Sequence, residues 1–202
     1  MHILVTGFEP FGQDSINASA QVLERLPSRL AGHRISTAIL PVSFSRTGPA
    51  LEAALVQHRP DALICLGEAG GRTRITPELW AYNLDKARIA DNDGQRPDST
   101  PIATDGPERV RATLDPEPML QALHEIGLPA ALSRDPGRFL CNHTAYRAYR
   151  SAVPALFIHL PAVRDAGQMA LVGAETDQAA PVATSLDFTR LSQGIEVCLG
   201  TL

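Results

Sequence analysis

The chain has 202 residues, of which 44% are hydrophobic and 20% charged, and these values are typical of one globular domain over residues 1–202. Its net charge is -4 and no lysine and arginine tract is present, which argues against nucleic acid or an anionic membrane as the main partner. No apolar stretch has the length of a membrane span and no secretory signal follows Met1, so we expect a cytoplasmic protein with small or peptidic partners.

Strand-like and helix-like patterns alternate along the chain. Apolar runs predict strands over residues 2–6, 35–42, 62–66 and 155–160. Helical patterns predict helices over residues 18–26, 49–58, 118–126, 142–151 and 186–199. This alternation indicates an α/β sandwich.

The remaining segments carry weaker signals. Residues 87–89 predict a short strand that ends in turn residues at 91–94. Residues 95–118, rich in Pro, Asp, Thr and Gly, predict a long surface loop. The polar, alanine-rich residues 173–183 predict a connection to the C-terminal helix rather than a second domain.

Three cysteines lie far apart, without a pair motif or zinc spacing, which fits a reducing compartment. Cys65 lies in an apolar run and Cys198 in the last predicted helix, so we interpret both as packed thiols. Cys141 differs because it falls in the first turn of a predicted helix, where free N–H groups and the helix dipole favour a thiolate. His159, near the end of a predicted strand, supplies a base, and the two together predict covalent catalysis.

Residues 6–12 follow the first predicted strand, where open α/β sheets form ligand crevices. They lack the glycine spacing of a dinucleotide site and the Lys-Ser/Thr of a phosphate loop. Phe8 and Phe11 predict either an apolar pocket wall or a plug at the edge of the sheet, and the pattern leaves both interpretations open.

Several motifs occur in order between residue 1 and about residue 161. They are Thr6-Gly-Phe-Glu-Pro-Phe-Gly12 with Asn17, Gly70-Gly71-Arg72 followed by Ile75-Thr76-Pro77-Glu78, Asn83, Ala87-Arg88-Ile89 with Asp91-Asn92-Asp93-Gly94, Cys141-Asn142-His143, and Phe157-Ile158-His159. In this combination they resemble the type I pyroglutamyl peptidases, also called pyrrolidone carboxyl peptidases. The resemblance implies a single-domain, three-layer α/β/α sandwich with a mixed, mostly parallel sheet.

The resemblance also implies a cysteine exopeptidase that hydrolyses the amide bond after an N-terminal pyroglutamate through a thioester, with no metal or organic cofactor. Carried onto this sequence, the catalytic residues are Glu78, Cys141 and His159. His159 would take the proton of the thiol and later protonate the leaving amine, and Glu78 would orient the imidazole. Arg88 would support the oxyanion beside the Cys141 backbone N–H.

The implied substrates are peptides with an N-terminal pyroglutamate, a small neutral lactam that suits an apolar slot with a few directed hydrogen bonds. The residues predicted to line this pocket are Phe8, Phe11, Asn17, Glu68, Ile89 and Leu140. Family members are commonly homotetramers, which the resemblance extends to this chain.

Three segments depart from the family pattern. Glu68 stands where glutamine is common, and a buried, unpaired glutamate is costly. Ser-Arg-Asp-Pro-Gly at residues 133–137 replaces a small polar approach to the cysteine. Residues 162–165 replace a proline-containing continuation, so no functional residue is carried over beyond His159.

Two other functions remain open: a thiol amidohydrolase for another small cyclic amide, and a non-catalytic pyroglutamyl-binding relative. Simpler interpretations of single residues also exist. His143, two residues after Cys141, faces away from it on a helix and is interpreted as a hydrogen-bonding or packing residue. Taken alone, Glu78 is an acid at a helix start, and Arg72 and Arg88 are surface ion-pair partners.

Overall fold

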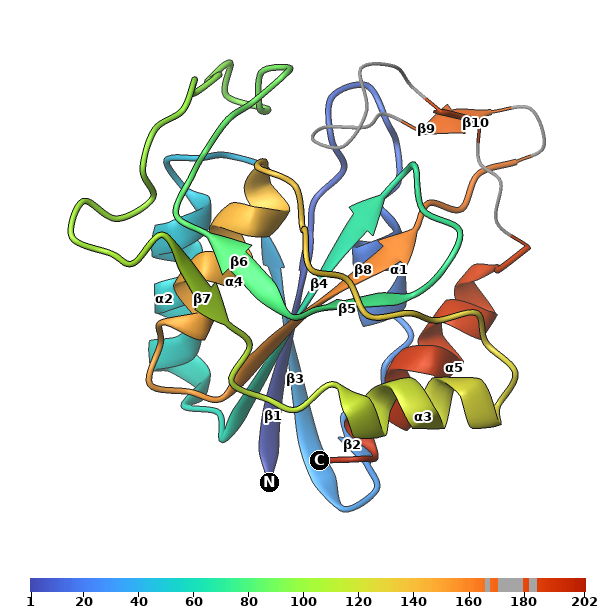
Figure 1. The fold of residues 1–202 in the computed structure, drawn as a ribbon. Helices are drawn as coiled ribbons and strands as arrows, with labels where there is room; N and C mark the ends of the chain where they lie inside the picture. Colours follow the sequence, from blue (N-terminus) through green and yellow to red (C-terminus); the bar gives the residue numbers. More distant parts are fainter. Residues whose placement is uncertain (166–167, 171–179, 182–184) are drawn as a thin grey trace.

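The computed structural model describes residues 1–165, 168–170, 180–181 and 185–202. A six-stranded sheet in the order β2-β3-β1-β4-β8-β5 forms its middle layer (Figure 1). The strands are β1 (His2–Phe8), β2 (Arg29–Leu30), β3 (His33–Leu40), β4 (Ala62–Ala69), β5 (Thr76–Glu78) and β8 (Ala155–Pro161). The four central strands run parallel, and the edge strands β2 and β5 run antiparallel to their neighbours, which confirms the mixed, mostly parallel sheet.

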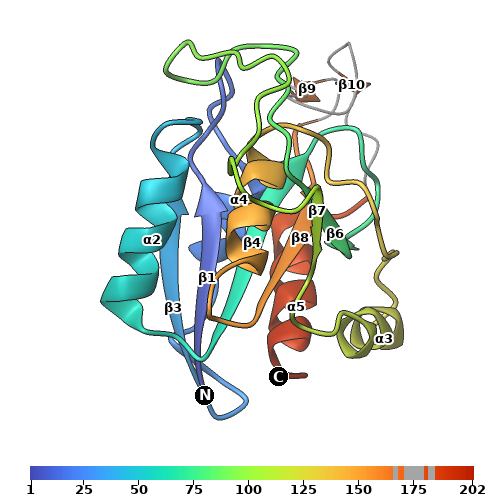
Figure 2. The same ribbon diagram turned by 60° about the vertical axis from the view of Figure 1, so that its left-hand side comes forward.

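Helices cover both faces of this sheet (Figures 1 and 2). They are α1 (Ala18–Leu23), α2 (Thr47–His58), α3 (Glu117–Glu125), α4 (Leu140–Tyr149) and α5 (Phe188–Leu199). Successive strand residues point to opposite faces, so in β4 Leu63 packs in the core beneath α2 and α4, whereas Ile64 packs in the core beneath α1, α3 and α5. The predicted three-layer α/β/α sandwich is therefore confirmed.

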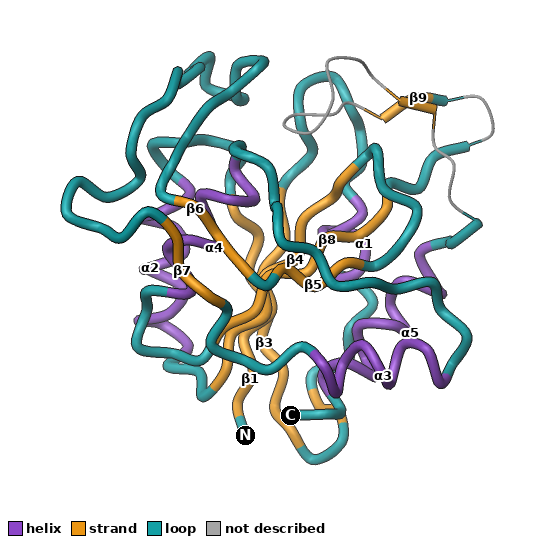
Figure 3. The backbone as a smooth tube through the Cα atoms, viewed as in Figure 1, coloured by secondary structure: helices purple, strands orange, loops and turns teal. Residues whose placement is uncertain are grey.

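Two small hairpin-like sheets lie outside these layers. β6 (Trp80–Tyr82) pairs with β7 (Arg109–Arg111), and β9 (Met169–Ala170) pairs with β10 (Ala180–Pro181). β6 contacts α4, and the chain between β6 and β7 is a long loop, drawn in teal in Figure 3. None of the helices in the described part of the chain has the length and apolar character of a membrane span.

The structure corrects three sequence predictions. Residues 87–89 form no strand: Ala87 N donates a backbone hydrogen bond to Pro97 O at 2.8 Å, and the neighbouring contact of Asp85 with Thr100 is an isolated bridge. The predicted loop over residues 95–118 contains β7, which finds its partner in β6. Helix α1 ends at Leu23, three residues before the predicted end, because Pro27 disfavours helical backbone before it. The predicted connection over residues 173–183 lies outside the described residues except for β10.

Candidate active site

The site lies where the carboxyl ends of β1, β4 and β8 meet. The connection from β1 to β3 runs through α1 on one face of the sheet, and that from β3 to β4 runs through α2 on the other. This reversal makes the gap between β1 and β4 the topological switch point, where open α/β sheets bind ligands. Helix α4 begins at Leu140, two residues earlier than predicted, so Cys141 is its second residue.

Glu78, Cys141 and His159 come together on the α4 face of the sheet. The antiparallel register of β5 and β8 places Glu78 opposite Phe157 and Thr76 opposite His159, so these side chains share one face. Glu78 Oε1 lies 2.7 Å from His159 Nδ1, and both side chains are almost completely buried. His159 also interacts electrostatically with the Cys141 side chain, and because Nδ1 faces Glu78, Nε2 is the nitrogen available to the sulfur.

The charges of these groups support one another. Burial alone would lower the pKa of His159, but the Cys141 thiolate and the Glu78 carboxylate outweigh this effect and raise it to about 10. Burial opposes the charge of Glu78, yet the hydrogen bond and charge of His159, together with the nearby Arg72 guanidinium, lower its pKa. An imidazolium beside the Glu78 carboxylate is therefore favoured, and it adjoins the Cys141 sulfur, which is the arrangement of a base that activates a cysteine nucleophile.

Gly67 allows the sulfur to approach His159. It pairs with His159 across β4 and β8. A Cβ at this position would lie 2.8 Å from Cys141 Sγ and 2.7 Å from the Phe157 ring, closer than such atoms pack. The sequence analysis did not select Gly67, although a glycine inside a buried strand often marks the close approach of another group.

The two residues after Cys141 anchor α4 to the chain that follows β6. The Asn142 side chain accepts a hydrogen bond from Tyr82 N and donates to Tyr82 O, both at 2.8 Å. His143 Nδ1 lies 2.8 Å from Asp85 Oδ2, and His143 Nε2 accepts a hydrogen bond from Arg147 Nε at 2.8 Å. The interpretation of His143 as a hydrogen-bonding residue is confirmed.

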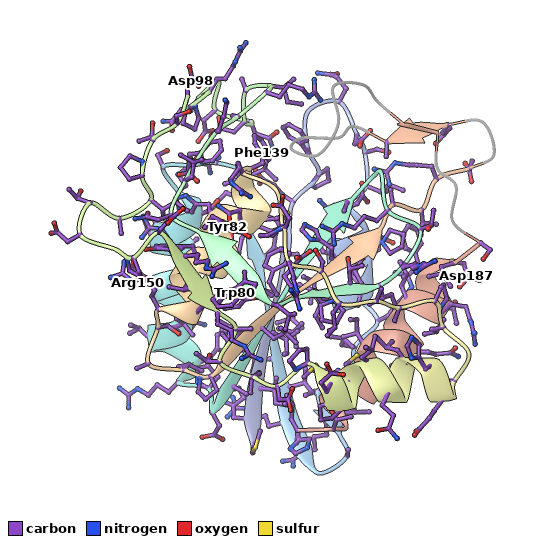
Figure 4. The ribbon with its side chains drawn as sticks, in the orientation of Figure 1. Trp80, Tyr82, Asp98, Phe139, Arg150 and Asp187 are labelled. Atoms are coloured by element: carbon purple, nitrogen blue, oxygen red, sulfur yellow. The ribbon has the colours of Figure 1, made fainter. Side chains whose placement is uncertain are left out.

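Three of the six predicted pocket residues, Phe8, Phe11 and Leu140, lie around the start of α4. Phe8 and Leu140 are buried in the core beneath α2 and α4. Phe11 packs against Phe139, with ring centroids 5.3 Å apart, and Figure 4 shows Phe139 at the N-terminal end of α4. Ile89 is partly buried in the loop after β6. Their arrangement is consistent with an apolar pocket wall, and their contact with a substrate stays a prediction.

Arg88 lies in the same loop as Ile89 and is partly buried. This loop is held beside the approach to α4, because Lys86 N donates a hydrogen bond to Arg138 O at 2.9 Å. Asn92 fastens the same loop to the turn after β1 by donating to Pro10 O at 3.0 Å. The proposed action of Arg88 on an oxyanion stays a prediction.

The side chains of Asn17 and Glu68 form hydrogen bonds within the fold, and their contact with a substrate stays a prediction. Asn17 Oδ1 caps α1 by accepting from Ser19 N at 3.0 Å, and its Nδ2 donates to Glu9 O at 3.2 Å. Glu68 follows Gly67 in β4, so its side chain points to the opposite face from Cys141. There it accepts a hydrogen bond from the backbone N–H of Ala18, the first residue of α1, at 2.7 Å.

Glu68 also forms an ion pair with Arg164. The two side chains are 2.7 Å apart and 7% and 4% exposed, and Arg164 binds Asp14 as well, at 2.8 Å. Burial raises the pKa of Glu68 in spite of the opposing charge of Arg164. Glu68 and Arg164, which belong to two separate departures from the family pattern, thus contact each other. Their pairing offsets the cost expected for an isolated buried glutamate.

Arg72 and Tyr149 contact Glu78 and were missed as site residues. Arg72 is 15% exposed and donates a hydrogen bond to Glu78 Oε1 at 2.6 Å, which corrects its interpretation as a surface ion-pair partner. The Tyr149 hydroxyl donates to Glu78 O at 2.7 Å and accepts from Phe157 N at 3.0 Å. Glu78 itself lies in strand β5, so its simplest interpretation, as an acid at a helix start, was wrong.

The other two thiols lie inside the two halves of the core, Cys65 on the α4 side of the sheet and Cys198 on the other side. Cys65 and Cys198 are buried, and burial raises the pKa of each to about 12. Their interpretation as packed thiols is confirmed. In the part of the chain that the structure describes, no three His, Cys, Asp or Glu side chains are grouped so as to hold a metal ion.

Comparisons with known proteins agree with this geometry. Residues 1–196 match the family described as pyroglutamyl peptidase. The chain is 37% identical to the pyrrolidone-carboxylate peptidase of Streptococcus suis, over all of this chain and 92% of that protein. The crystal structure of Bacillus amyloliquefaciens pyroglutamyl peptidase I is similar with a TM-score of 0.87 and 31% identity, over 99% of this chain and 95% of that one. The pyrrolidone carboxyl peptidase of Thermus thermophilus is similar with a TM-score of 0.86 and 33% identity, over 99% and 100% of the two chains.

Proposed function

The chain belongs to the pyroglutamyl peptidase family, and from this premise we propose that it is a cysteine exopeptidase that releases pyroglutamate from the N-terminus of peptides. One observation of the structure carries the proposal: Glu78 Oε1 lies 2.7 Å from His159 Nδ1, and the same imidazole interacts with the Cys141 sulfur, which lies over Gly67. A carboxylate, a buried imidazole and a thiol in this order are the parts of a cysteine nucleophile with its base.

In the proposed reaction the Cys141 thiolate attacks the carbonyl carbon that joins pyroglutamate to the next residue. The resulting oxyanion is stabilised by the Cys141 backbone N–H in the first turn of α4, with Arg88 as the proposed second donor. The carbonyl re-forms, the C–N bond breaks, and the His159 imidazolium protonates the leaving amine. Water, deprotonated by the neutral His159, then hydrolyses the thioester and releases pyroglutamate.

Substrate selection follows from the proposed pocket. Pyroglutamate has no free α-amine and carries no charge in its ring, so it favours an apolar slot. Phe8, Phe11 and Leu140 support this assignment, because they contribute to the apolar core at the start of α4. Ile89 is partly buried in the loop after β6. Glu68 was one of two reasons to consider another cyclic amide, and its pairing with Arg164 removes it as a reason.

Localisation and assembly belong to the same proposal. A cytoplasmic location suits a reaction that needs the Cys141 thiol in its reduced form. A homotetramer is the assembly that the family resemblance implies.

The test is release of a fluorescent amine from its pyroglutamyl, prolyl and alanyl amides under reducing conditions. We expect hydrolysis of the pyroglutamyl amide alone, abolished in Cys141→Ala and retained in Cys198→Ala, which removes a buried thiol on the opposite side of the sheet. Folded wild-type protein that hydrolyses none of the amides, or a Cys141→Ala variant with full activity, would contradict the proposal.

A further inference from the structure

Arg72 lies in the segment between β4 and β5 and is directed at the carboxylate of Glu78. It donates to Glu78 Oε1 at 2.6 Å, the oxygen that also lies 2.7 Å from His159 Nδ1. The same guanidinium donates to the Thr76 hydroxyl and, through its other terminal nitrogen, to the Asp135 carbonyl oxygen at 2.9 Å. One side chain therefore connects the carboxylate, its strand and the segment that leads to α4.

We propose that Arg72 is a positioning residue for catalysis, which holds Glu78 as an oriented anion and ties it to the segment preceding Cys141. This inference rests on the proposed peptidase function, because it assigns a task within the same site.

The burial of Glu78 explains why such a partner is needed. Its side chain is 0% exposed, and an ionised carboxylate removed from water is stable only when charges and hydrogen bonds replace the solvent. The groups that face the Glu78 carboxylate are Arg72, His159 from β8 and the Ser133 hydroxyl from the adjoining segment, whereas the Tyr149 hydroxyl from α4 binds the Glu78 backbone oxygen. Of these groups, the guanidinium alone keeps its charge throughout the reaction, because His159 gives its proton to the leaving amine.

The charge of Arg72 has a predictable direction of effect. It contributes to the lowered pKa of Glu78, so without it the carboxylate takes up a proton at a higher pH. Protonated Glu78 no longer stabilises the His159 imidazolium, and the imidazolium–thiolate pair is lost with it. Removal of Arg72 must therefore displace the acid limb of the activity profile toward neutral pH.

The second contact gives Arg72 a geometric task. Ser133 pairs with β5 through hydrogen bonds from Ser133 N to Pro77 O and from Leu79 N to Ser133 O. From there the chain passes Asp135, whose carbonyl binds Arg72, and reaches Cys141 within six residues. Because the contact is made to a backbone oxygen, it tolerates the altered side chains of residues 133–137.

The experiment compares Arg72→Met, which removes the charge and the three hydrogen bonds described above, with Arg72→Lys, which keeps the charge on a single nitrogen. Arg109→Met is the matched control, because Arg109 stacks on Trp80 at 4.5 Å on the exposed face of β6 and β7. Two pH profiles are measured for each protein: hydrolysis of a pyroglutamyl amide, and alkylation of Cys141 by iodoacetamide. The alkylation is specific in the folded protein because Cys65 and Cys198 are buried.

We expect Arg72→Met to lower kcat/KM at least about tenfold and to move the acid limb of both profiles upward by about one pH unit. Arg72→Lys should recover part of the rate with a smaller displacement, and Arg109→Met should match the wild type. A folded Arg72→Met variant whose acid limbs stay in the wild-type position would overturn the proposal, even if its thermal stability falls.

Two further outcomes are also decisive. If Arg72→Met does not fold, Arg72→Lys carries the test, and wild-type profiles for the lysine variant overturn the proposal. If the wild type hydrolyses no pyroglutamyl amide, the proposed function fails, while the alkylation profiles still show whether Arg72 controls the charge state of the Cys141 site.

Discussion

Two buried histidine–carboxylate pairs lie at or beside α4, and the contact between Nδ1 and the carboxylate is nearly the same in both. His159 Nδ1 is 2.7 Å from Glu78, and His143 Nδ1 is 2.8 Å from Asp85. Three of the four side chains are less than 5% exposed, and Asp85 is 8% exposed. A search for an imidazole oriented by an acid would therefore select both pairs.

The second ring nitrogen separates them. The second nitrogen of His159 faces the Cys141 sulfur, where it can take or return a proton. That of His143 accepts a hydrogen bond from Arg147 Nε, so its lone pair is already occupied by a permanent cation. Proximity in sequence is a poor guide here, since His143 is two residues from Cys141 and His159 is on another element. One pair is arranged for proton transfer, and the other fastens α4 to the loop after β6.

The largest expected effect comes from replacing each histidine by glutamine. His159→Gln should lower kcat/KM at least about 10³-fold, because the thiol loses its base and the leaving amine its acid. His143→Gln should lower it less than about tenfold and cost about 1–3 kcal/mol of stability, because a buried hydrogen bond is broken. Kinetics and thermal unfolding of the two variants check both expectations. If a folded His143→Gln variant were as inactive as His159→Gln, the distinction between the pairs would be wrong.

A smaller loss of activity is expected when the distance between Cys141 and His159 is changed without replacing either residue. Gly67→Ala places a Cβ against Cys141 Sγ and the Phe157 ring, so the sulfur must move. A displacement of about 1 Å at a reacting atom costs about 10²-fold in rate. Gly200→Ala is the control, because the nearest atom to its Cβ is 3.4 Å away, at the end of α5. Single-turnover kinetics measure the chemical step. Equal rates for Gly67→Ala and Gly200→Ala would show that the sulfur does not depend on this gap.

The central strands and the five helices were predictable because each is long enough to display a period. β5, β6 and β7 have three residues each, too few for a pattern, and their pairing is decided by partners elsewhere in the chain. Residues 87–89 have strand-like composition but find no partner strand in the described structure, so the prediction there was wrong.

The site residues also divide into those with a local sequence signal and those that depend on distant partners. Cys141 and His159 could be selected from the elements that carry them, whereas Glu78 entered only through the family resemblance. Arg72 was missed because its role depends on a contact with Glu78 across a bend of the chain. The pairing of Glu68 with Arg164 was missed because the two residues are 96 positions apart and no local pattern connects them.

The smallest expected effect tests the hydrogen bond that occupies His143. Arg147→Met removes the donor to His143 Nε2 and leaves the contact with Asp85 in place. Loss of one hydrogen bond from a charged donor should lower the free energy of unfolding by about 1–3 kcal/mol. Activity should stay within about twofold of the wild type, because the released nitrogen belongs to the pair that only fastens α4. Urea unfolding and kcat/KM measure the two quantities, with Arg46→Met, which breaks an exposed ion pair with Asp93, as the control. A large fall in kcat/KM with unchanged stability would mean that this histidine also serves the reaction, since a purely structural contact affects stability first.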